Sequence, residues 1–532
     1  MRRLFGVRVG VGVVVVALSQ GVAVPVAVAA PEAPTYTSSV YRTSGCAPEG
    51  CGGIGVEDTF LFASASADVV KFRWGFTDFP VAEVAPGTPV RWAPAEAGPK
   101  SLYVDAVDSS GAATRSRFDF SVAAPRAQEA QWFAWEDDPA SDSSGNGHDL
   151  TLTGVDVARA GRTVGGPATV GFDGDVATGA TTAKVLDTTQ GITVSAWVRL
   201  TDGSADRTAV SQQGAVESAF RLGYDADTLR WTFAVAEKDA LGSAQRTVRS
   251  VARAVPGVWT HLTGTYDDVS GEVRLYVDGV AQENVPVVKK GFAAGGELWI
   301  GKALRSGVAA EAWRGELTEL VVWNRAVTPR EVRELTGAAR VGYWLFNDGG
   351  GRFATDSSPY AHDIATFTGD VAYGAGHGGT GLAFGGGTAS VRTSEAVLYT
   401  DQSFTVDVWA KLDGTGVPGV VVAQRGPSGV DPFTLRYDGA QWSAEMPDAS
   451  ANPTKVWRAK GDAVAGRWTH LVATYDASAR TLSLSVGHDD TADVQKSSVA
   501  RVTGWNSDGV LVVGESFRGG VDELQTLQGV VR

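Results

Sequence analysis

The sequence predicts an all-β chain in which two tandem antiparallel β-sandwiches follow a smaller β-sandwich. Three observations carry this prediction. Short segments alternate apolar and polar residues with the period of a strand, one ordered set of such segments occurs twice, and helical patterns are almost absent between them. The 66 glycines and 21 prolines among 532 residues also suit a protein with many tight turns.

A duplication organises most of the chain. Four pairs of similar segments keep their order and a slowly drifting offset: 132–137 with 343–348, 192–200 with 404–412, 258–267 with 467–476, and 313–320 with 517–524. The long offset excludes solenoid repeats, which recur about every 20–50 residues. We therefore expect two homologous domains, at 130–337 and 341–532, whose loops differ in length.

The repeated segments have the pattern of strands. In the segment 192–200, two faces alternate: Ile192, Val194, Ala196 and Val198 on one, and Thr193, Ser195, Trp197 and Arg199 on the other. Asp278-Gly279 suits a type I′ hairpin turn. One short helix is expected at 327–335, because Thr328 and Glu331 can form a capping box around Pro329.

The region before the duplication contains two parts. Residues 1–30 have the charged start, apolar stretch and small-residue cleavage site of a signal peptide, so we expect a secreted, extracellular protein. Residues 35–124 carry short alternating strands, which we interpret as a small Ig-like β-sandwich. In an exported chain the only cysteines, Cys46 and Cys51, are expected to form a disulfide.

Composition limits the partners. The net charge is −14 and no basic run follows the N-terminus, which excludes nucleic acid as a partner because phosphate contacts need clustered Lys and Arg. No later stretch has about 18 uninterrupted apolar residues, so no membrane span is expected. The oligomeric state stays open.

The repeated motifs together resemble a known family. The DSSGNGH turn at 142–148, the ITVSAW and FTVDVW strands, the WTHL strands, and LYVDG and VDEL are similar to the LamG-like jelly-roll domains of secreted bacterial proteins, in the concanavalin A-like lectin/glucanase group. The resemblance implies two tandem two-sheet jelly rolls, at 130–337 and 341–532. It leaves the ligand open, since members bind glycans or proteins and some relatives are hydrolases.

The resemblance also implies a candidate calcium site. In such domains calcium is held by the Asp-Ser-Ser turn together with an acidic residue of the last strands. That carries over to Asp356 and Asp522 in the second copy, whereas in the first copy Asp142 is kept but Thr318 replaces the second carboxylate. The alternative is that Asp142 and Asp356 form Asx-turns without any metal.

Catalytic patterns are absent from the sequence. A glycosidase of this fold class needs two carboxylates on one strand face, whereas Glu316 and Glu319 lie on opposite faces. Ser143 and His148 beside Asp142 lack the Gly-x-Ser-x-Gly elbow of a hydrolase. We therefore expect no catalytic residues and no enzyme activity.

Sixteen tryptophans raise the question of sugar stacking. Trp197/Trp409, Trp231/Trp442 and Trp259/Trp468 match between the copies, which favours core packing. Unmatched Trp457 and Trp505 are the candidates for an exposed ligand platform. The predicted function is binding of polysaccharide or cell-surface glycan. Alternatives are an adhesion or scaffold protein that binds extracellular proteins, and a glycoside hydrolase of unrecognised type.

Overall fold

The computed structural model describes residues 30–45, 51–53, 58–94, 96–123, 128–133, 138–159, 161–167, 169–288, 290–489 and 493–531. The chain forms two compact units, residues 1–125 and 126–532. The predicted signal peptide, apart from Ala30, and Cys46 lie outside the described residues, so secretion and the Cys46–Cys51 disulfide stay predictions. No helix in the described ranges has the length and apolarity needed to cross a membrane.

The N-terminal unit is a small two-sheet β-sandwich, as predicted. Its sheets have the orders β1-β2-β5 and β4-β3-β6-β7, with the bounds β1 (Thr35–Thr37), β2 (Asp58–Ala63), β3 (Val69–Gly75), β4 (Ala82–Val84), β5 (Val90–Trp92), β6 (Gly98–Asp108) and β7 (Ala113–Val122). Aromatic residues of both sheets, among them Phe60, Phe72 and Phe120, pack into one core. An immunoglobulin-like character stays a prediction.

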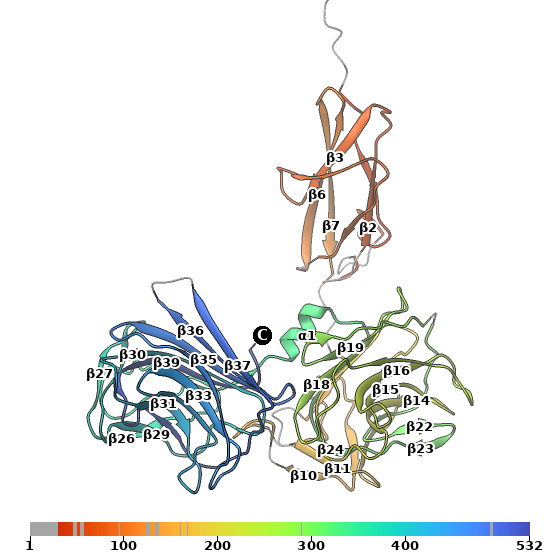
Figure 1. The fold of residues 1–532 in the computed structure, drawn as a ribbon. Helices are drawn as coiled ribbons and strands as arrows, with labels where there is room; N and C mark the ends of the chain where they lie inside the picture. Colours follow the sequence, from red (N-terminus) through yellow and green to blue (C-terminus); the bar gives the residue numbers. More distant parts are fainter. Residues whose placement is uncertain are drawn as a thin grey trace, which may run out of the picture. The chain divides into compact units, whose positions relative to one another are not determined.

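The first jelly roll packs two antiparallel sheets face to face (Figure 1). One sheet, which we call the outer sheet in both jelly rolls, contains the first and last strands of the domain. It comprises, in spatial order, β10 (Asp156–Arg159), β11 (Thr169–Asp173), β24 (Arg314–Trp323), β13 (Ile192–Leu200), β18 (Thr260–Tyr266), β19 (Val273–Val277) and β20 (Val280–Ala281), with β8 (Ala130–Trp132) also paired to β24. The facing sheet comprises β17 (Gln245–Arg249), β16 (Arg230–Ala236), β15 (Ser218–Asp225), β14 (Arg207–Gln213), β21 (Leu298–Ile300), β12 (Thr178–Thr181) and β9 (Leu150–Thr153). β22 (Ala303–Arg305) and β23 (Val308–Ala310) form a separate hairpin.

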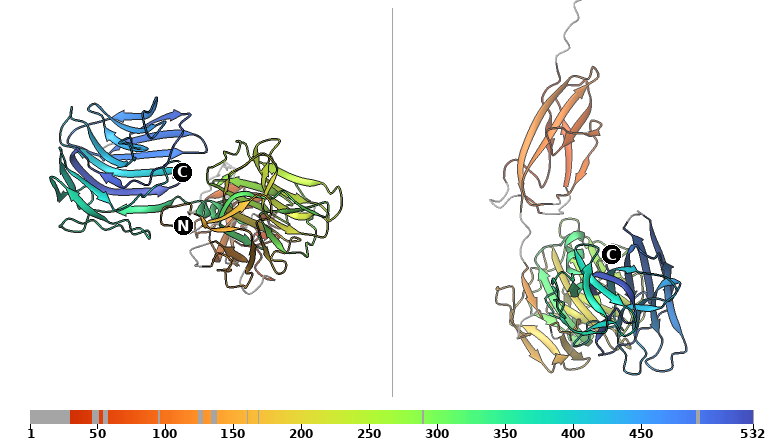
Figure 2. Two further views of the ribbon diagram at one scale, coloured as in Figure 1. Left: turned by 90° about the horizontal axis from the view of Figure 1, so that it is seen from below. Right: turned by 90° about the vertical axis from the view of Figure 1, so that its left-hand side faces the viewer.

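The second jelly roll repeats this arrangement (Figures 1 and 2). Its outer sheet comprises β27 (Val371–Ala375), β28 (Thr380–Gly385), β39 (Arg518–Gln528), β30 (Phe404–Leu412), β35 (Trp468–Asp476), β36 (Thr481–His488) and β37 (Val494–Ala500), with β25 (Ala339–Trp344) also paired to β39. The facing sheet comprises β26 (Ile364–Thr368), β29 (Ser390–Thr393), β38 (Leu511–Val513), β31 (Gly419–Gln424), β32 (Phe433–Tyr437), β33 (Gln441–Pro447) and β34 (Val456–Asp462).

The repeated segments occupy the same positions in both jelly rolls. Trp197 of β13 pairs with His261 of β18, and Trp409 of β30 pairs with His470 of β35. The pairing of 132–137 with 343–348 is wrong by one residue. Trp132 corresponds to Trp344, because each lies opposite the equivalent leucine of the last strand and its indole N–H donates to the carbonyl of the following His-Asp turn.

Two local predictions are confirmed. The β19–β20 hairpin turns at Asp278-Gly279, with φ angles of 47° and 77° that a type I′ turn requires. The helix α1 (Pro329–Leu335) begins at Thr328, which caps it through the predicted box with Glu331. Val332 is fully buried against Tyr276 and other apolar residues on the outer face of the first jelly roll.

Candidate functional site

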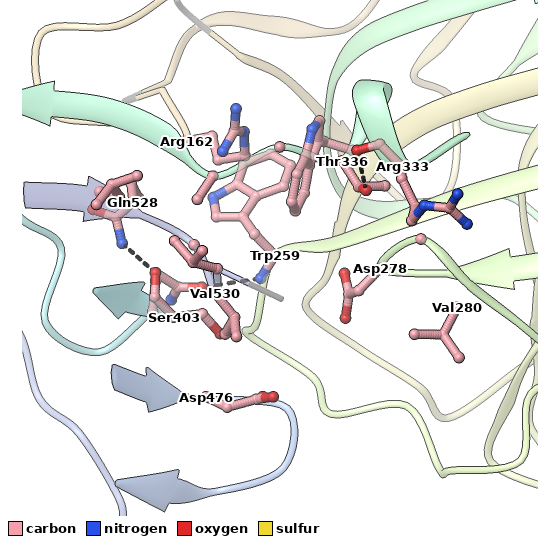
Figure 3. Close-up of a pocket in the computed structure, with 18 residues that line it drawn as sticks. Arg162, Trp259, Asp278, Val280, Arg333, Thr336, Ser403, Asp476, Gln528 and Val530 are labelled. Atoms are coloured by element: carbon pink, nitrogen blue, oxygen red, sulfur yellow. Dashed lines mark hydrogen bonds between the residues drawn. The ribbon is translucent and has the colours of Figure 1, made fainter. Parts of the chain in front are cut away.

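A pocket of about 430 Å³ lies where the two jelly rolls meet (Figure 3). One side comes from the first jelly roll and helix α1, and the opposite side from the second jelly roll. Segments that are hundreds of residues apart in the sequence therefore build one cavity. Its lining includes Arg162, Trp197, Trp259, Asp278, Val280, Arg333, Gln402, Ser403, Asp476, Gln528 and Val530.

Two tryptophans form the apolar wall on the side of the first jelly roll. Core packing was expected for the matched Trp197 and Trp259, and both are buried, at 7% and 6% exposed. They lie on the outward face of the sheet, outside the apolar cluster between the sheets. The strand alternation contained this information, because Trp197 shares a face with Ser195 and Arg199. Arg199 also lies over the Trp259 ring, at 5.5 Å from its centroid.

Arg162 covers the Trp197 ring. Its guanidinium carbon is 4.2 Å from the ring centroid, and its Nη2 lies 3.0 Å from Oε1 of Glu319. Glu319 has a φ of 50°, at a register shift between β13 and β24, and this bulge turns its carboxylate toward the outer face. The ion pair and the cation–π contact fix Arg162 at the pocket wall.

His261 lies buried beside Trp197 and contributes to packing within the sheet. Its Nε2 is 3.0 Å from Oγ of Ser195, and its ring centroid is 5.1 Å from that of Trp197. Burial, with the nearby charge of Arg162 as the smaller cause, lowers the pKa of His261 to about 3. The imidazole is therefore neutral at physiological pH.

Two glutamines of the second jelly roll fix the walls of the pocket. Gln402 accepts the backbone N–H of Trp259 at 2.9 Å and donates to the carbonyl of Gly257 at 3.1 Å. Gln528 donates to the carbonyl of Ser403 at 2.8 Å (Figure 3). Gln402 thus joins the two jelly rolls, and Gln528 fixes the wall of the second one, so the pocket has its shape before any ligand binds.

Charged groups stand at the rim of the pocket. Asp278 accepts the backbone N–H of His261 at 2.9 Å, and Asp476 lines the opposite side. Arg333 is exposed on α1, and no ion-pair partner for it is found among the described residues. The site thus combines an aromatic and aliphatic interior with hydrogen-bonding groups at its entrance, which suits a small polar ligand that has an apolar face.

The carboxylates that were predicted to bind calcium accept hydrogen bonds from backbone N–H groups. Asp142 accepts the backbone N–H groups of Gln131, Ser144 and His148, each at 3.0 Å. Burial favours a raised pKa for Asp142, but these donors outweigh it and hold the pKa below the usual value. The bond from the Ser144 N–H to the Asp142 carboxylate is that of an Asx-turn, which was the alternative to a calcium site.

The second copy repeats this arrangement. Asp356 accepts the backbone N–H groups of Tyr343, Ser358 and His362. Asp522 is fully buried and accepts those of His377 and Gly378 at 2.8 and 3.0 Å. Within the described ranges no group of three or more His, Cys, Asp or Glu residues could hold a metal ion. Calcium binding is a prediction that these contacts do not favour.

We expect chelation to leave the melting temperature of the protein unchanged. The Asp356 carboxylate already accepts N–H groups, so it offers a cation no free set of ligands, and a metal that binds only the folded state would raise stability. Calorimetry in calcium and then in excess EDTA measures the difference. A drop of several degrees that calcium reverses would contradict this expectation.

The two tryptophans that were predicted to form an exposed ligand platform, Trp457 and Trp505, lie at different depths in the second jelly roll. Trp457 is only 6% exposed and belongs to the core of the second jelly roll, so its assignment as an exposed platform is wrong. The alternation of β34 turns it inward. Trp505 is half-buried, and its indole N–H donates to the carbonyl of Pro447 at 3.1 Å. Neither lines the pocket.

The carboxylates considered for catalysis have structural partners. Glu316 is buried and forms two hydrogen bonds with the Arg199 guanidinium, at 2.8 and 3.0 Å. Glu319 holds Arg162. The Asp142 carboxylate accepts the backbone N–H of His148. No hydrogen bond between this carboxylate and the His148 ring is found among the described residues. These contacts assign the three carboxylates to the fold.

Comparisons with known proteins give a family match. The family model described as the concanavalin A-like lectin/glucanases superfamily matches residues 173–333 and 385–531, more than half of the chain. A search among curated proteins finds no match.

Solved structures with similar folds include three sugar complexes. One is domain 4 of an extracellular GH43 arabinanase from Geobacillus stearothermophilus with arabinotriose (21% identity, TM-score 0.30, 40% of this chain and 98% of that chain). Another is the sialidase CBM40 of Ruminococcus gnavus with α2,6-sialyllactose (15%, 0.25, 28% and 84%). A third is the binding domain of botulinum neurotoxin DC with SialylT (9%, 0.34, 75% and 98%). At these low TM-scores none of them carries a functional argument.

Proposed function

Since the chain belongs to the concanavalin A-like lectin/glucanases superfamily, we propose that it is a secreted, non-catalytic glycan-binding protein. The pocket between the jelly rolls is its binding site. The observation that carries this proposal is the combination of Trp197 and Trp259 with hydrogen-bonding groups at the rim of one preformed cavity.

The chemistry of a sugar ring matches this lining. A pyranose has an apolar face of C–H groups, which packs against exposed apolar side chains, here Val280 and Val531, beside the small exposed part of Trp259. Its hydroxyl groups need planar polar partners, and the Asp278 and Asp476 carboxylates and the Arg333 guanidinium stand at the rim. The volume of about 430 Å³ is that of a site for a small ligand.

A recessed pocket favours a glycan over a protein partner. Protein interfaces of ordinary size bury roughly 800 Å² on each partner over a broad surface. A sugar residue, in contrast, fits a cavity of the size found here. We propose no hydrolysis, because Asp278 uses one carboxylate oxygen to hold the backbone of His261.

Secretion forms part of this proposal and rests on residues 1–30. An oxidising compartment is also the setting in which Cys46 and Cys51 would pair. Mass spectrometry of protein recovered from the culture medium tests both points, through the mass of the mature N-terminus and through the absence of free thiols. An intact N-terminus in cell-associated protein would contradict secretion.

We expect Arg333→Ala to weaken glycan binding about tenfold while the melting temperature stays unchanged. Arg333 is an exposed pocket residue on α1. The matched control is Arg330→Ala on the same helix, since Arg330 pairs with Glu334 and does not line the pocket. A glycan array identifies the ligand, and isothermal titration compares the two variants.

Two results would overturn the proposed function. One is an array without a single binder. The other is equal affinity of the Arg333→Ala and Arg330→Ala proteins for every glycan bound. Release of shorter sugars during a long incubation with the bound glycan would show that the protein is a hydrolase and not only a binding protein.

A further inference from the structure

Three parallel rings stand in a row on the outer face of the second jelly roll. The ring centroids of His377 and Trp409 are 3.6 Å apart with an interplanar angle of 10°, and those of Trp409 and His470 are 4.8 Å apart with an angle of 18°. His377 follows β27, Trp409 belongs to β30 and His470 to β35. The row therefore crosses the strands of the outer sheet. We call these three residues the ring row.

Carboxylates stand at both ends of the ring row. Oδ1 of Asp407 is 2.6 Å from Nε2 of His470, and Oε2 of Glu523 is 3.8 Å from Nδ1 of His377. The side chains of His377 and His470 are 27% and 38% exposed. Solvent, and hence a ligand, can reach the imidazoles and their carboxylate partners.

The loop that carries His377 is fixed by buried groups. The Asp522 carboxylate accepts the backbone N–H groups of His377 and Gly378. Gly376 must lack a side chain, because a Cβ there would lie 2.4 Å from Oδ2 of Asp522. Glu523 has a φ of 48° at a register shift between β30 and β39, the same bulge that Glu319 forms in the first jelly roll. The ring row is thus preorganised.

The first jelly roll contains the buried counterpart of this arrangement. There the bulged Glu319 holds Arg162 over Trp197, and His261 stands on the other side. Trp197 is only 7% exposed and His261 2%. Helix α1 packs on the same face, against Tyr276, Val321 and Trp323.

The aligned face of the second jelly roll is more polar and more accessible than that of the first. The residues that correspond to Tyr276, Val321 and Trp323 are Ser485, Gln525 and Leu527, and all three are half-buried. Among the described residues α1 is the sole α-helix, and it lies on the first jelly roll. The duplication has therefore produced one closed and one open version of the same sheet face.

We propose that the ring row is a second glycan subsite, which takes a neutral, hydroxyl-rich sugar. This inference rests on the proposed function, because it assigns a second site to the same class of ligand. The Asp407 and Glu523 carboxylates accept hydroxyl hydrogens, and the imidazoles of His377 and His470 can donate or accept. Because the rings stack on one another, the row presents ring edges to the solvent, and these supply the apolar surface for C–H groups.

The sign of the charges selects the sugar class. Asp407 and Glu523 repel a sugar that carries a carboxylate or a sulfate, whereas they do not oppose a neutral one. Lys411 lies over the Trp468 ring, at 5.4 Å from its centroid, at the edge of the ring row. The pocket between the jelly rolls differs, because it combines the exposed Arg333 with the carboxylates of Asp278 and Asp476. The two sites are therefore expected to have different preferences.

Titration of the full mature chain with cellotetraose, xylotetraose, mannotetraose, laminaritetraose and tetragalacturonate tests this proposal. We expect a neutral tetrasaccharide to bind at two sites per chain, and His470→Gln or Asp407→Asn to remove one of them. Arg333→Ala should weaken only the other site. In the Arg333→Ala background, where the pocket is weakened, the intrinsic fluorescence change on binding should be lost in Trp409→Phe. Unchanged melting temperatures in the Asp407→Asn protein confirm that the sheet is folded.

Each other outcome has a distinct meaning. A single site that only Arg333→Ala weakens would refute the ring row and leave the proposed function intact. A single site that only Asp407→Asn and His470→Gln remove would support the ring row and refute the pocket. Binding of tetragalacturonate to the ring row as strong as that of the neutral sugars would overturn the assignment of sugar class. Absence of binding by all five probes and by the array would refute both sites.

Discussion

Replacing Asp356 by Ala is expected to lower the free energy of unfolding by about 3 kcal/mol or more, because a buried donor left without an acceptor costs roughly 1–3 kcal/mol. The Asp356 carboxylate is only 7% exposed and accepts the N–H groups of Tyr343, Ser358 and His362. It joins the end of β25 to the turn that carries His362. Urea unfolding measures the loss.

The first jelly roll offers an equivalent variant for comparison. Asp142→Ala removes the equivalent carboxylate from the first jelly roll, and a loss of similar size is expected there. Ser357→Ala is the control, because Ser357 is exposed in the same turn and only its backbone N–H is bonded. If Asp356→Ala were as stable as Ser357→Ala, the carboxylate would not hold the turn.

The Asp142 carboxylate predicts sensitivity to acid. The donors around Asp142 hold its pKa below the usual value, so the folded state binds a proton less readily than the unfolded state. This contribution is fully present above the unfolded pKa of about 4, and it is lost as the pH falls through the lower folded pKa. The stability difference between the natural protein and Asp142→Asn should therefore shrink below about pH 4.

The second large effect is expected for Gly514→Ala, which should lower the free energy of unfolding by about 3 kcal/mol through steric overlap and backbone strain together. A Cβ at Gly514 would lie 2.0 Å from Cε1 of the buried Phe384 ring. Gly514 also has a φ of 76°, which disfavours a side chain. Calorimetry of the variant measures the fall in melting temperature.

A nearby glycine separates the two causes. Gly386 has a φ of 82°, but the nearest atom to a Cβ there is 3.7 Å away, so Gly386→Ala should cost only the strain of about 1 kcal/mol. Gly301 is the counterpart of Gly514 in the first jelly roll, and its Cβ would lie 2.6 Å from the Phe172 ring. Equal stability of the Gly514→Ala and Gly386→Ala proteins would show that the ring contact is unimportant.

The sequence by itself determined the features that depend on short-range chemistry. The strand alternation, the Asp278-Gly279 turn and the Thr328 cap are properties of a few neighbouring residues, and all three are confirmed. The duplication could also be read directly, because homologous strands keep their order in the chain. The outward position of Trp197 follows from the alternation, and its burial follows from the packing that the matched tryptophans predict.

The tertiary structure decided which sheet faces are covered and which groups meet. Arg162, Trp259, Gln402 and Gln528 line one pocket although no sequence pattern links them, because contacts across such distances depend on how whole sheets pack. The sequence left calcium and Asx-turn open for Asp356, and only the positions of the backbone donors favour the turn. Likewise, the equivalent His261 and His470 stand in the same WTHL motif, yet His261 is buried beside Ser195 whereas His470 is partly exposed and pairs with Asp407, because each meets a different neighbour on the adjacent strand.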